Sequence, residues 1–347
     1  MSEFFGRKPF DKDTFPLPLT DSSQIFEQAG KRNAAEVMQL IKNVQTILQQ
    51  ENLCGKGNLA ETIPSTWDSS NGDKYFVDGK IAYLPLKGTA IFVGDTHADS
   101  ISTEKIVRQT GFIETIENGG GKEKTYLVFL GDYIDRGKNN MRNLEIVLDL
   151  KARYPNNVVL LMGNHEEGRW FPQNFNESIL KHFESQDDQR KVALTYKTLF
   201  GQLPVVLVTA NGIVAVHGGV PIGEVRNLQE LRNNEELFEQ IRANDPDSYL
   251  SSFVLSDRGI GYKFGKRIFD QFMRNIGGTV MVRSHEYPRE GYKLLFDDRL
   301  VTIFSNGGTS DESQYRDKVH PKYMIVSLKE PVSSINLKNI FIVFNET

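Results

Sequence analysis

Residues 126–166 read YLVFLGDYIDRGKNNMRNLEIVLDLKARYPNNVVLLMGNHE, and this stretch determines the type of fold. Residues 126–130 and 158–162 are short apolar runs with the length of strands that are buried on both faces. Between them, residues 143–154 carry leucine and valine at helical spacing and stop before Pro155. A strand, a helix and a second strand in this order predict a βαβ unit with parallel strands.

Similar patterns continue on both sides of this unit. Further short apolar runs have strand length, and later segments are typical of a hairpin and of final strands. The apolar runs are residues 90–93, 213–216 and 279–282. The hairpin is predicted from residues 292–296 and 299–304, and the final strands from residues 323–328 and 340–344. The alternation of strands and helices indicates an α/β protein.

The N-terminal segment has a different character. Its first 20 residues contain three prolines and are expected to form an extended arm. Asn33 and Glu36 have the spacing of a capping box, and a helix that packs on the core is predicted over residues 34–50. After this helix we expect a polar loop over residues 55–80, with a short strand at residues 74–77.

The composition is that of an ordinary soluble globular protein, with 39% hydrophobic and 25% charged residues. The formal net charge of −4 offers no attraction to nucleic acid or to an anionic membrane, so neither is an expected partner.

The N-terminus lacks an apolar stretch of signal-peptide length, and no apolar run could span a bilayer, so we expect a cytoplasmic location. Cys54 is the single cysteine, which excludes an internal disulfide and a metal site built from cysteines.

Each of five predicted strands is followed at once by a polar cluster. Ligands of α/β proteins gather at the carboxyl ends of strands, because the loops there converge on one crevice. The clusters are GDTH at 94–97, GDYIDRG at 131–137, GNHE at 163–166, HGG at 217–219 and RSH at 283–285. We therefore expect one site that contains Asp95, His97, Asp132, Asn164, His165, His217 and His285.

The chemistry of these side chains indicates a metal centre. Carboxylates, imidazoles and an amide oxygen, without any thiol, suit manganese, iron or zinc. The potential ligands outnumber those that one ion needs, and a carboxylate can bridge two ions, so we predict a pair of ions roughly 3.5–4 Å apart. Such a pair lowers the pKa of a bound water and screens the charge of a phosphate.

The ordered motifs, together with DRGIGYKFG at 257–265, resemble the phosphoprotein phosphatase family of calcineurin-like metallophosphoesterases. The resemblance covers roughly residues 85–345. It implies a central sandwich of two mixed sheets flanked by helices, in a catalytic domain over residues 86–347 that follows an N-terminal arm and helical extension over residues 1–85. It also implies that phosphoserine and phosphothreonine in proteins are hydrolysed in one step by a metal-activated hydroxide, without a phosphoenzyme.

The resemblance further implies a role for each motif residue. Asp95 and His97 resemble ligands of the first ion, Asp132 the bridge, and Asn164, His217 and His285 the ligands of the second. The ions are divalent or trivalent: manganese is expected in vitro, and an iron–zinc or a manganese pair in vivo. Arg136 and Arg258, with Asn164, resemble the groups that bind the substrate phosphate. His165 resembles the general acid, and Asp135 resembles the carboxylate that orients it.

Two features depart from the family pattern. Ala98 stands where a glycine is usual after GDTH, and it is expected to have a negative φ, because positive φ favours glycine. The loop after the last hairpin, residues 305–310, lacks the aromatic residue and the cysteine that eukaryotic members carry there.

Other interpretations stay open at this point. Asp135 could be only a partner of Arg136, and residues 170–175 could be a substrate-facing loop or a hydrophobic cluster. Glu166 is expected to cap the backbone, Arg283 to be structural, and His182 and His320 to lie at the surface. The protein could also be a diadenosine tetraphosphate hydrolase, a phosphodiesterase of the same superfamily, or a scaffold without activity that binds phosphoproteins.

Overall fold

The computed structural model describes residues 21–63, 75–119, 124–167 and 171–344. The extended arm predicted for the first 20 residues lies outside these ranges, as does Lys74 of the predicted strand at 74–77. Within the described ranges, no helix is long and apolar enough to cross a membrane.

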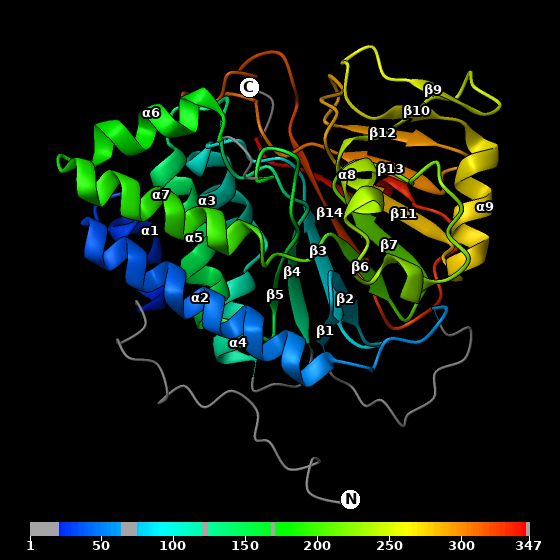
Figure 1. Ribbon diagram of the computed structural model, residues 1–347, viewed down its shortest axis with the longest axis horizontal. Coiled ribbons are helices and arrows are strands. Elements are labelled where there is room, and N and C mark those ends of the chain that lie inside the picture. Colours follow the sequence, from blue (N-terminus) through cyan, green and yellow to red (C-terminus); the bar gives the residue numbers. More distant parts are fainter. Residues whose placement is uncertain (1–20, 64–74, 120–123, 168–170, 345–347) are drawn as a thin grey trace, which may run out of the picture.

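The centre of the molecule is a sandwich of two mixed sheets, which confirms the predicted fold (Figure 1). Each sheet contains parallel and antiparallel pairs. One sheet has the order β15 (Ile340–Ile342), β14 (Lys322–Ser327), β3 (Thr89–Val93), β4 (Thr125–Phe129), β5 (Val158–Leu160). The other has the order β1 (Phe76–Asp78), β2 (Ile81–Leu84), β6 (Val206–Thr209), β7 (Ile213–Val216), β11 (Val280–Arg283), β13 (Leu300–Ile303), β12 (Tyr292–Leu295).

The predicted βαβ unit and hairpin are both present. Strands β4 and β5 pair in parallel, and α5 (Asn140–Arg153) connects them. The helix forms here because apolar residues line one side of it, and it ends shortly before Pro155. Strands β12 and β13 pair antiparallel around a turn that contains Asp297 and Asp298. A third, small sheet has the order β8 (Asp245–Pro246), β10 (Tyr262–Phe264), β9 (Phe253–Leu255).

Alternate residues of the facing strands form the core between the two large sheets. Ala90, Phe92 and Val128 of one sheet pack in the same buried cluster as Leu207 and Val282 of the other. The opposite face of each strand packs against helices in a second cluster. Because both faces of these strands are buried, their sequences are continuous apolar runs, as the sequence predicted.

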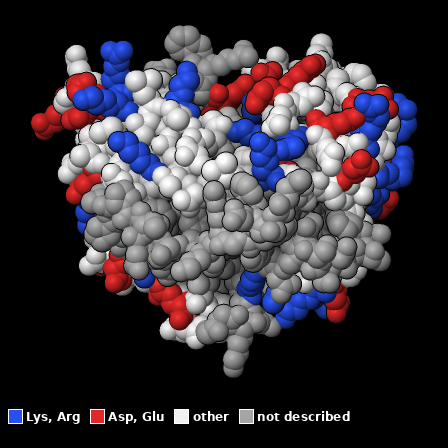
Figure 2. All heavy atoms as spheres, turned by 60° about the horizontal axis from the view of Figure 1, so that its bottom comes forward, with Lys and Arg blue, Asp and Glu red and all other residues white. Residues whose placement is uncertain are grey.

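Helices cover the outer faces of the sandwich. Figure 1 shows α1 to α7 on one side and α9 on the other. The helices on the first side are α1 (Ile25–Gln28), α2 (Ala34–Gly55), α3 (Ser100–Gln109), α4 (Phe112–Asn118), α5, α6 (Gln173–His182) and α7 (Gln186–Phe200). The remaining two are α8 (Glu235–Ala243) and α9 (Lys266–Ile276). Figure 2 shows the lower side of Figure 1, where Lys and Arg lie beside Asp and Glu among the described residues.

Helix α2 begins as predicted and ends later than predicted. Asn33 and Glu36 form the reciprocal capping box, and the helix continues five residues past residue 50 to Gly55. Its apolar face packs against α5, α7 and β1, which confirms that it lies on the core. Strands β1 and β2 join the seven-stranded sheet, and the domain boundary at residues 85 and 86 stays a prediction.

Two sets of buried ion pairs fix α2 to α5. At the start of α2, Arg32 donates to the carboxylates of Glu145 and Asp149, at 2.8 Å each. Near its end, the fully buried Lys151 ammonium forms an ion pair with Glu51, which also accepts from the Tyr75 hydroxyl. Burial lowers the pKa of Lys151 and raises the pKa of Glu51, so each charge depends on its partner to remain ionised.

We expect Lys151→Ala to destabilise the protein by about 3–5 kcal/mol, because it leaves the Glu51 carboxylate buried without its cation. The double variant Lys151→Met with Glu51→Leu should be more stable than Lys151→Ala, since it buries no uncompensated charge. Urea unfolding followed by fluorescence measures both. Lys191→Ala, which breaks the exposed pair with Asp187, is the control and should leave the midpoint unchanged. An equal loss in Lys151→Ala and in the double variant would contradict this explanation.

Candidate functional site

The polar clusters predicted from the sequence converge where the ends of the two large sheets meet. A parallel bridge between Asp95 and Phe304 joins the ends of β3 and β13. Gly94 makes this approach possible, because a side-chain carbon there would overlap the Ile303 carbonyl. Ser284 connects the two strands, since its hydroxyl accepts from the Asp95 amide at 2.8 Å and donates to the Ile303 carbonyl at 2.7 Å.

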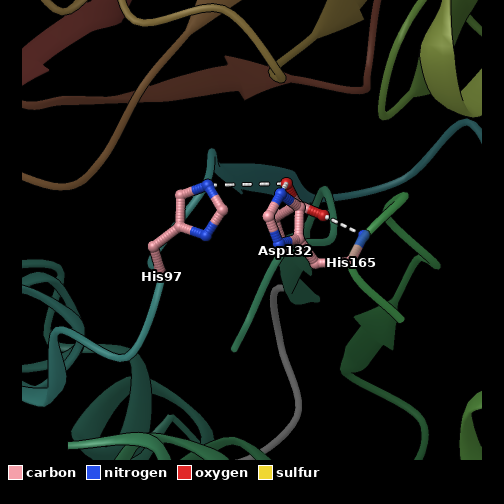
Figure 3. A group of neighbouring side chains, drawn as sticks. All are labelled: His97, Asp132 and His165. Carbon is pink, nitrogen blue, oxygen red and sulfur yellow. Dashed lines mark hydrogen bonds and ion pairs between the residues drawn. The ribbon is translucent and has the colours of Figure 1, made fainter. Parts of the chain in front are cut away.

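The Asp132 carboxylate lies at the centre of the site. Its Oδ2 is 3.3 Å from His217 Nε2, 3.5 Å from His97 Nε2 and 3.7 Å from His165 Nε2. Figure 3 shows the His97 ring directed at this carboxylate, and the His165 ring lies edge to face with His97, with the ring centroids 4.8 Å apart. Burial would raise the pKa of Asp132, but His217 and His165 hold it well below its usual range, so the group is a carboxylate.

Asp95 supplies a second buried carboxylate to the same place. Its Oδ1 accepts from the His285 amide at 3.1 Å, and its Oδ2 lies 3.5 Å from His97 Nε2. Oδ2 is buried and accepts no hydrogen bond from any residue that the structure describes. A buried anionic oxygen without a donor, beside imidazole nitrogens, is the arrangement that a cation compensates. The residues present therefore fit the metal ions that the sequence predicts.

The histidine rings are held with one nitrogen towards the carboxylates. His97 Nδ1 donates to the Ile134 carbonyl at 2.9 Å, and His217 Nδ1 donates to the Leu130 carbonyl at 3.0 Å. Backbone carbonyls in this position fix the tautomer and leave Nε2 available to a metal. Backbone carbonyls at the end of β4 and in the GDYIDRG segment that follows it therefore orient imidazoles that come from two other strand ends.

Two groups of ligand atoms lie close enough to hold an ion each, with Asp132 in both. In one group His97, Asp132 and His165 have ligand atoms within 4.8 Å of one another, and in the other Asp132, His217 and His285 do. Asn164 Oδ1 lies 3.0 Å from His217 Nε2, so the amide joins the second group. All seven side chains that the sequence predicted to share a site are therefore together.

His165 and Asp135 form a pair at the edge of this cluster. His165 Nδ1 lies 3.0 Å from Asp135 Oδ2, and each side chain is 14% exposed. Burial alone would lower the pKa of His165, but Asp132 and Asp135 raise it to about 9, so the imidazole carries a proton near neutral pH. Arg136 Nε is farther from the same carboxylate oxygen, at 3.4 Å, so the interaction with His165 is the closer one.

Two guanidinium groups reach the site from different loops. Arg136 follows Asp135 directly, and its side chain is 47% exposed. Arg258 comes from the connection between β9 and β10; it donates to His285 Nε2 at 2.7 Å and lies 3.5 Å from Asp245 Oδ2. Both are exposed enough to bind an anion that enters the site from solvent.

Backbone strain is concentrated at the site. Ten described residues other than glycine have a positive φ. Five of them belong to the motifs, and a sixth, Ala98, directly follows GDTH; the five are His97, Asp132, Asp135, Arg136 and His285. The prediction of a negative φ for Ala98 was wrong, because its φ is +57°. Its amide donates to the Tyr133 carbonyl and its carbonyl accepts from the Asn139 amide, so buried hydrogen bonds offset the cost of this conformation.

Glu166 caps the backbone, as predicted. Its carboxylate accepts from the amides of Asp132, Tyr133 and Gly163, at 2.9, 2.9 and 3.0 Å. Burial and the nearby Asp132 raise the pKa of Glu166 to about 7. Gly163 has no room for a side chain, which would overlap Asp132 Oδ1. Glu166 therefore joins the ends of β4 and β5 and holds the Asp132 backbone in place.

Two tyrosines that the sequence did not predict lie beside the site. The Tyr315 ring stacks on the His97 ring, with ring centroids 6.1 Å apart. The centroid of the Tyr287 ring lies 5.0 Å from that of the Tyr315 ring. Residues 305–310 contain no aromatic residue, but the same connection continues to Tyr315, whose ring packs against His97. No periodicity or motif marks these tyrosines in the sequence.

Other predicted residues have structural roles. Arg283 is fully buried and forms ion pairs with Asp245 and Glu286, as expected. Phe171 and Phe175 pack with Phe200, so the described part of the 170–175 segment is a hydrophobic cluster. His182 and His320 are partly buried and do not belong to the metal-binding groups.

Comparison with known proteins places this geometry in a family. The model of the calcineurin-like phosphoesterase family matches residues 88–289. Over 232 residues the chain is 30% identical to the serine/threonine-protein phosphatase PP2A-like PPG1 of Candida albicans, covering 64% of this chain and 52% of that protein. It is 32% identical over 197 residues to the serine/threonine-protein phosphatase 4 catalytic subunit of Saccharomyces cerevisiae, covering 54% and 62%. The chain thus spans about half to two thirds of the length of these relatives.

A solved structure shows the same fold. It is a protein serine/threonine phosphatase from Saccharomyces cerevisiae with similarity to human phosphatase PP5. It aligns with a TM-score of 0.63 and 20% identity, over 90% of this chain and 89% of that chain. With the family model matching more than half of its residues and the metal-binding groups lying at the ends of the matched strands, the chain belongs to the calcineurin-like phosphoesterase family.

Proposed function

We propose that this protein is a metal-dependent phosphomonoesterase that removes phosphate from phosphoserine and phosphothreonine in proteins. The observation that carries the proposal is the pair of His165 and Asp135, 3.0 Å apart, beside the buried Asp132 carboxylate. A protonated imidazole in this position can donate to the oxygen of a departing alkoxide, which is a poor leaving group. The relatives named as serine/threonine-protein phosphatases support the choice of substrate.

Two metal ions belong to this proposal. Asp95, His97 and Asp132 would hold the first, and Asp132, Asn164, His217 and His285 would hold the second. When bound, the ions supply Lewis acidity, which activates a water for attack and neutralises phosphate charge. The pair is proposed to be manganese in vitro and manganese or iron with zinc in vivo, since imidazole and carboxylate ligands suit these metals.

The remaining side chains bind and orient the substrate. Arg136 and Arg258, which come from different loops, would each donate to phosphate oxygens, together with the Asn164 amide. Asp135 would keep the His165 ring oriented and protonated. No serine or cysteine is needed as a nucleophile, so we propose a single displacement without a phosphoenzyme. The partners are phosphorylated proteins, and the cytoplasmic location stays a prediction.

The metal pair is tested by stoichiometry. After removal of metals with a chelator, we expect the protein to bind two manganese ions per chain in a calorimetric titration and to gain thermal stability as it binds them. Asp132→Asn should lose at least one of these ions, because the residue belongs to both groups. His320→Ala is the matched control, and it should keep both. Binding of only one ion to the unaltered chain would refute the paired centre.

The substrate class is tested by rates. With manganese, we expect hydrolysis of a phosphoserine peptide to be at least tenfold faster, in kcat/KM, than hydrolysis of diadenosine tetraphosphate or of a bis-aryl phosphodiester. The reason is that His165 is placed to protonate a monoester's alkoxide. Faster cleavage of either alternative would favour the other enzymes of the superfamily. Two bound ions with no hydrolysis of any substrate, including an aryl phosphate, would favour a scaffold.

The proton donor is tested by leaving groups. We expect His165→Asn to lower kcat for a phosphoserine peptide about 10²–10⁴-fold, and to lower kcat for p-nitrophenyl phosphate much less, because nitrophenolate leaves without a proton. Steady-state kinetics with saturating manganese measure both. His182→Asn provides the control at a histidine outside the cluster. Equal losses on the two substrates would show that His165 does not deliver the proton.

A further inference from the structure

The strand and the turn on either side of Arg258 expose large apolar side chains to solvent. Strand β9 is exposed at all three of its residues, with Phe253 43%, Val254 46% and Leu255 72% exposed. Ile260, in the turn that leads to β10, is 71% exposed. Exposed apolar residues that are contiguous along one strand are typical of a surface that binds another protein or a ligand.

Strand β9 is also the edge of its sheet. Its only partner in the described chain is β10, which pairs on its other side with β8. The Ser256 amide donates to the Gly261 carbonyl at 3.0 Å, and Val254 is paired with Lys263. In an antiparallel pair, alternate residues direct their backbone groups to the partner strand. The amides and carbonyls of Phe253 and Leu255 therefore face outward along the open edge.

This open edge leads directly into the candidate site. Leu255 is three residues before Arg258, a distance of at most about 10–11 Å along an extended chain. The Arg258 guanidinium is 2.7 Å from His285 Nε2, within one of the metal-binding groups. A peptide whose phosphate is bound by Arg258 would therefore have residues within two or three positions of the phosphorylated one in reach of β9.

We propose that β9 binds the substrate itself: an extended segment of the phosphorylated protein adds to the edge of the small sheet. The outward amides and carbonyls of Phe253 and Leu255 would pair with the segment's backbone, and the apolar side chains would contact valine, isoleucine or leucine beside the phosphorylated residue. The inference rests on the proposed function. It adds that the enzyme prefers apolar residues within about three positions of the phosphate.

A segment of substrate explains the combination of features better than a second copy of the chain does. An edge used for pairing two copies would need no arginine that reaches into the metal cluster. Asp257, next to Arg258, is 85% exposed at its side chain and forms an ion pair with Lys263, which adds a polar rim to the apolar strand. An apolar strand with a charged rim and a phosphate-binding arginine at its end suits an extended phosphopeptide.

The experiment compares the whole enzyme, with manganese, on two kinds of substrate. We measure kcat/KM for a phosphoserine peptide with leucine and valine on both sides of the phosphoserine, and divide it by kcat/KM for p-nitrophenyl phosphate, which has no peptide. Leu255→Ser should lower this ratio about tenfold, because the variant loses a leucine contact that forms only with the peptide. Leu194→Ser, at a 54% exposed leucine of α7, is the matched control and should leave the ratio unchanged.

A second arm uses the unaltered enzyme, so that it does not depend on the folding of a variant. Two versions of the peptide carry N-methyl groups on alternate backbone amides. In one version the methyl groups meet β9 and in the other they point away, so only one should lose kcat/KM by tenfold or more.

The outcomes separate the two proposals. If p-nitrophenyl phosphate is not hydrolysed at all, the proposed function fails. If the enzyme is active but Leu255→Ser keeps the ratio, and both methylated peptides react alike, β9 does not bind the substrate. Sedimentation tests for pairing between two copies of the chain. If the enzyme is a dimer, and Leu255→Ser makes it a monomer without changing the ratio, the edge binds a second copy and the inference is overturned.

Discussion

The structure depends on one constraint: two carboxylates, Asp95 and Asp132, are buried together at the meeting point of two sheets. Burying an anion without compensation is costly, and two anions close together repel each other. The imidazoles of His97 and His217 lie within 3.6 Å of these carboxylates and offset part of the cost. The buried Asp95 Oδ2 has no hydrogen-bond donor among the described residues, which is an arrangement that a cation compensates.

This constraint explains the unusual backbone around the site. Each ligand must turn into the cluster immediately after a strand, and several do so with a positive φ, at a cost of about 1–3 kcal/mol per residue. The surrounding structure has to compensate for that cost. Glu166 contributes by accepting hydrogen bonds from three backbone amides, and the Asp132 carbonyl accepts hydrogen bonds from the amides of Thr96 and His97. The ends of β3, β4 and β5 are thereby joined to one another by hydrogen bonds within the protein.

Much of the site could be predicted from the sequence because its residues follow buried strands directly. An apolar run that ends in Gly-Asp places the aspartate at the carboxyl end of the strand, whatever the rest of the chain does. Features that arise from tertiary contact could not be predicted in this way. Tyr315 reaches His97 through an irregular loop, and Ala98 accepts a positive φ because distant carbonyl and amide groups hold it. Likewise β2 was not predicted, and it is a strand because it pairs with β1 on one side and with β6 on the other.

The two sheets contribute different parts of the proposed chemistry. Asp132, Asp135 and His165 come from the ends of β4 and β5, so the proposed proton donor and the central carboxylate follow two strands that pair with each other. His217 and His285 follow strands of the seven-stranded sheet, and Arg258 is attached to them through its contact with His285. The distance between the proposed proton donor and Arg258 therefore depends on the relative position of the two sheets. Gly94 and Ser284 help to fix that position, because Gly94 allows the close approach of β3 to β13 and the Ser284 hydroxyl bonds to both strand ends.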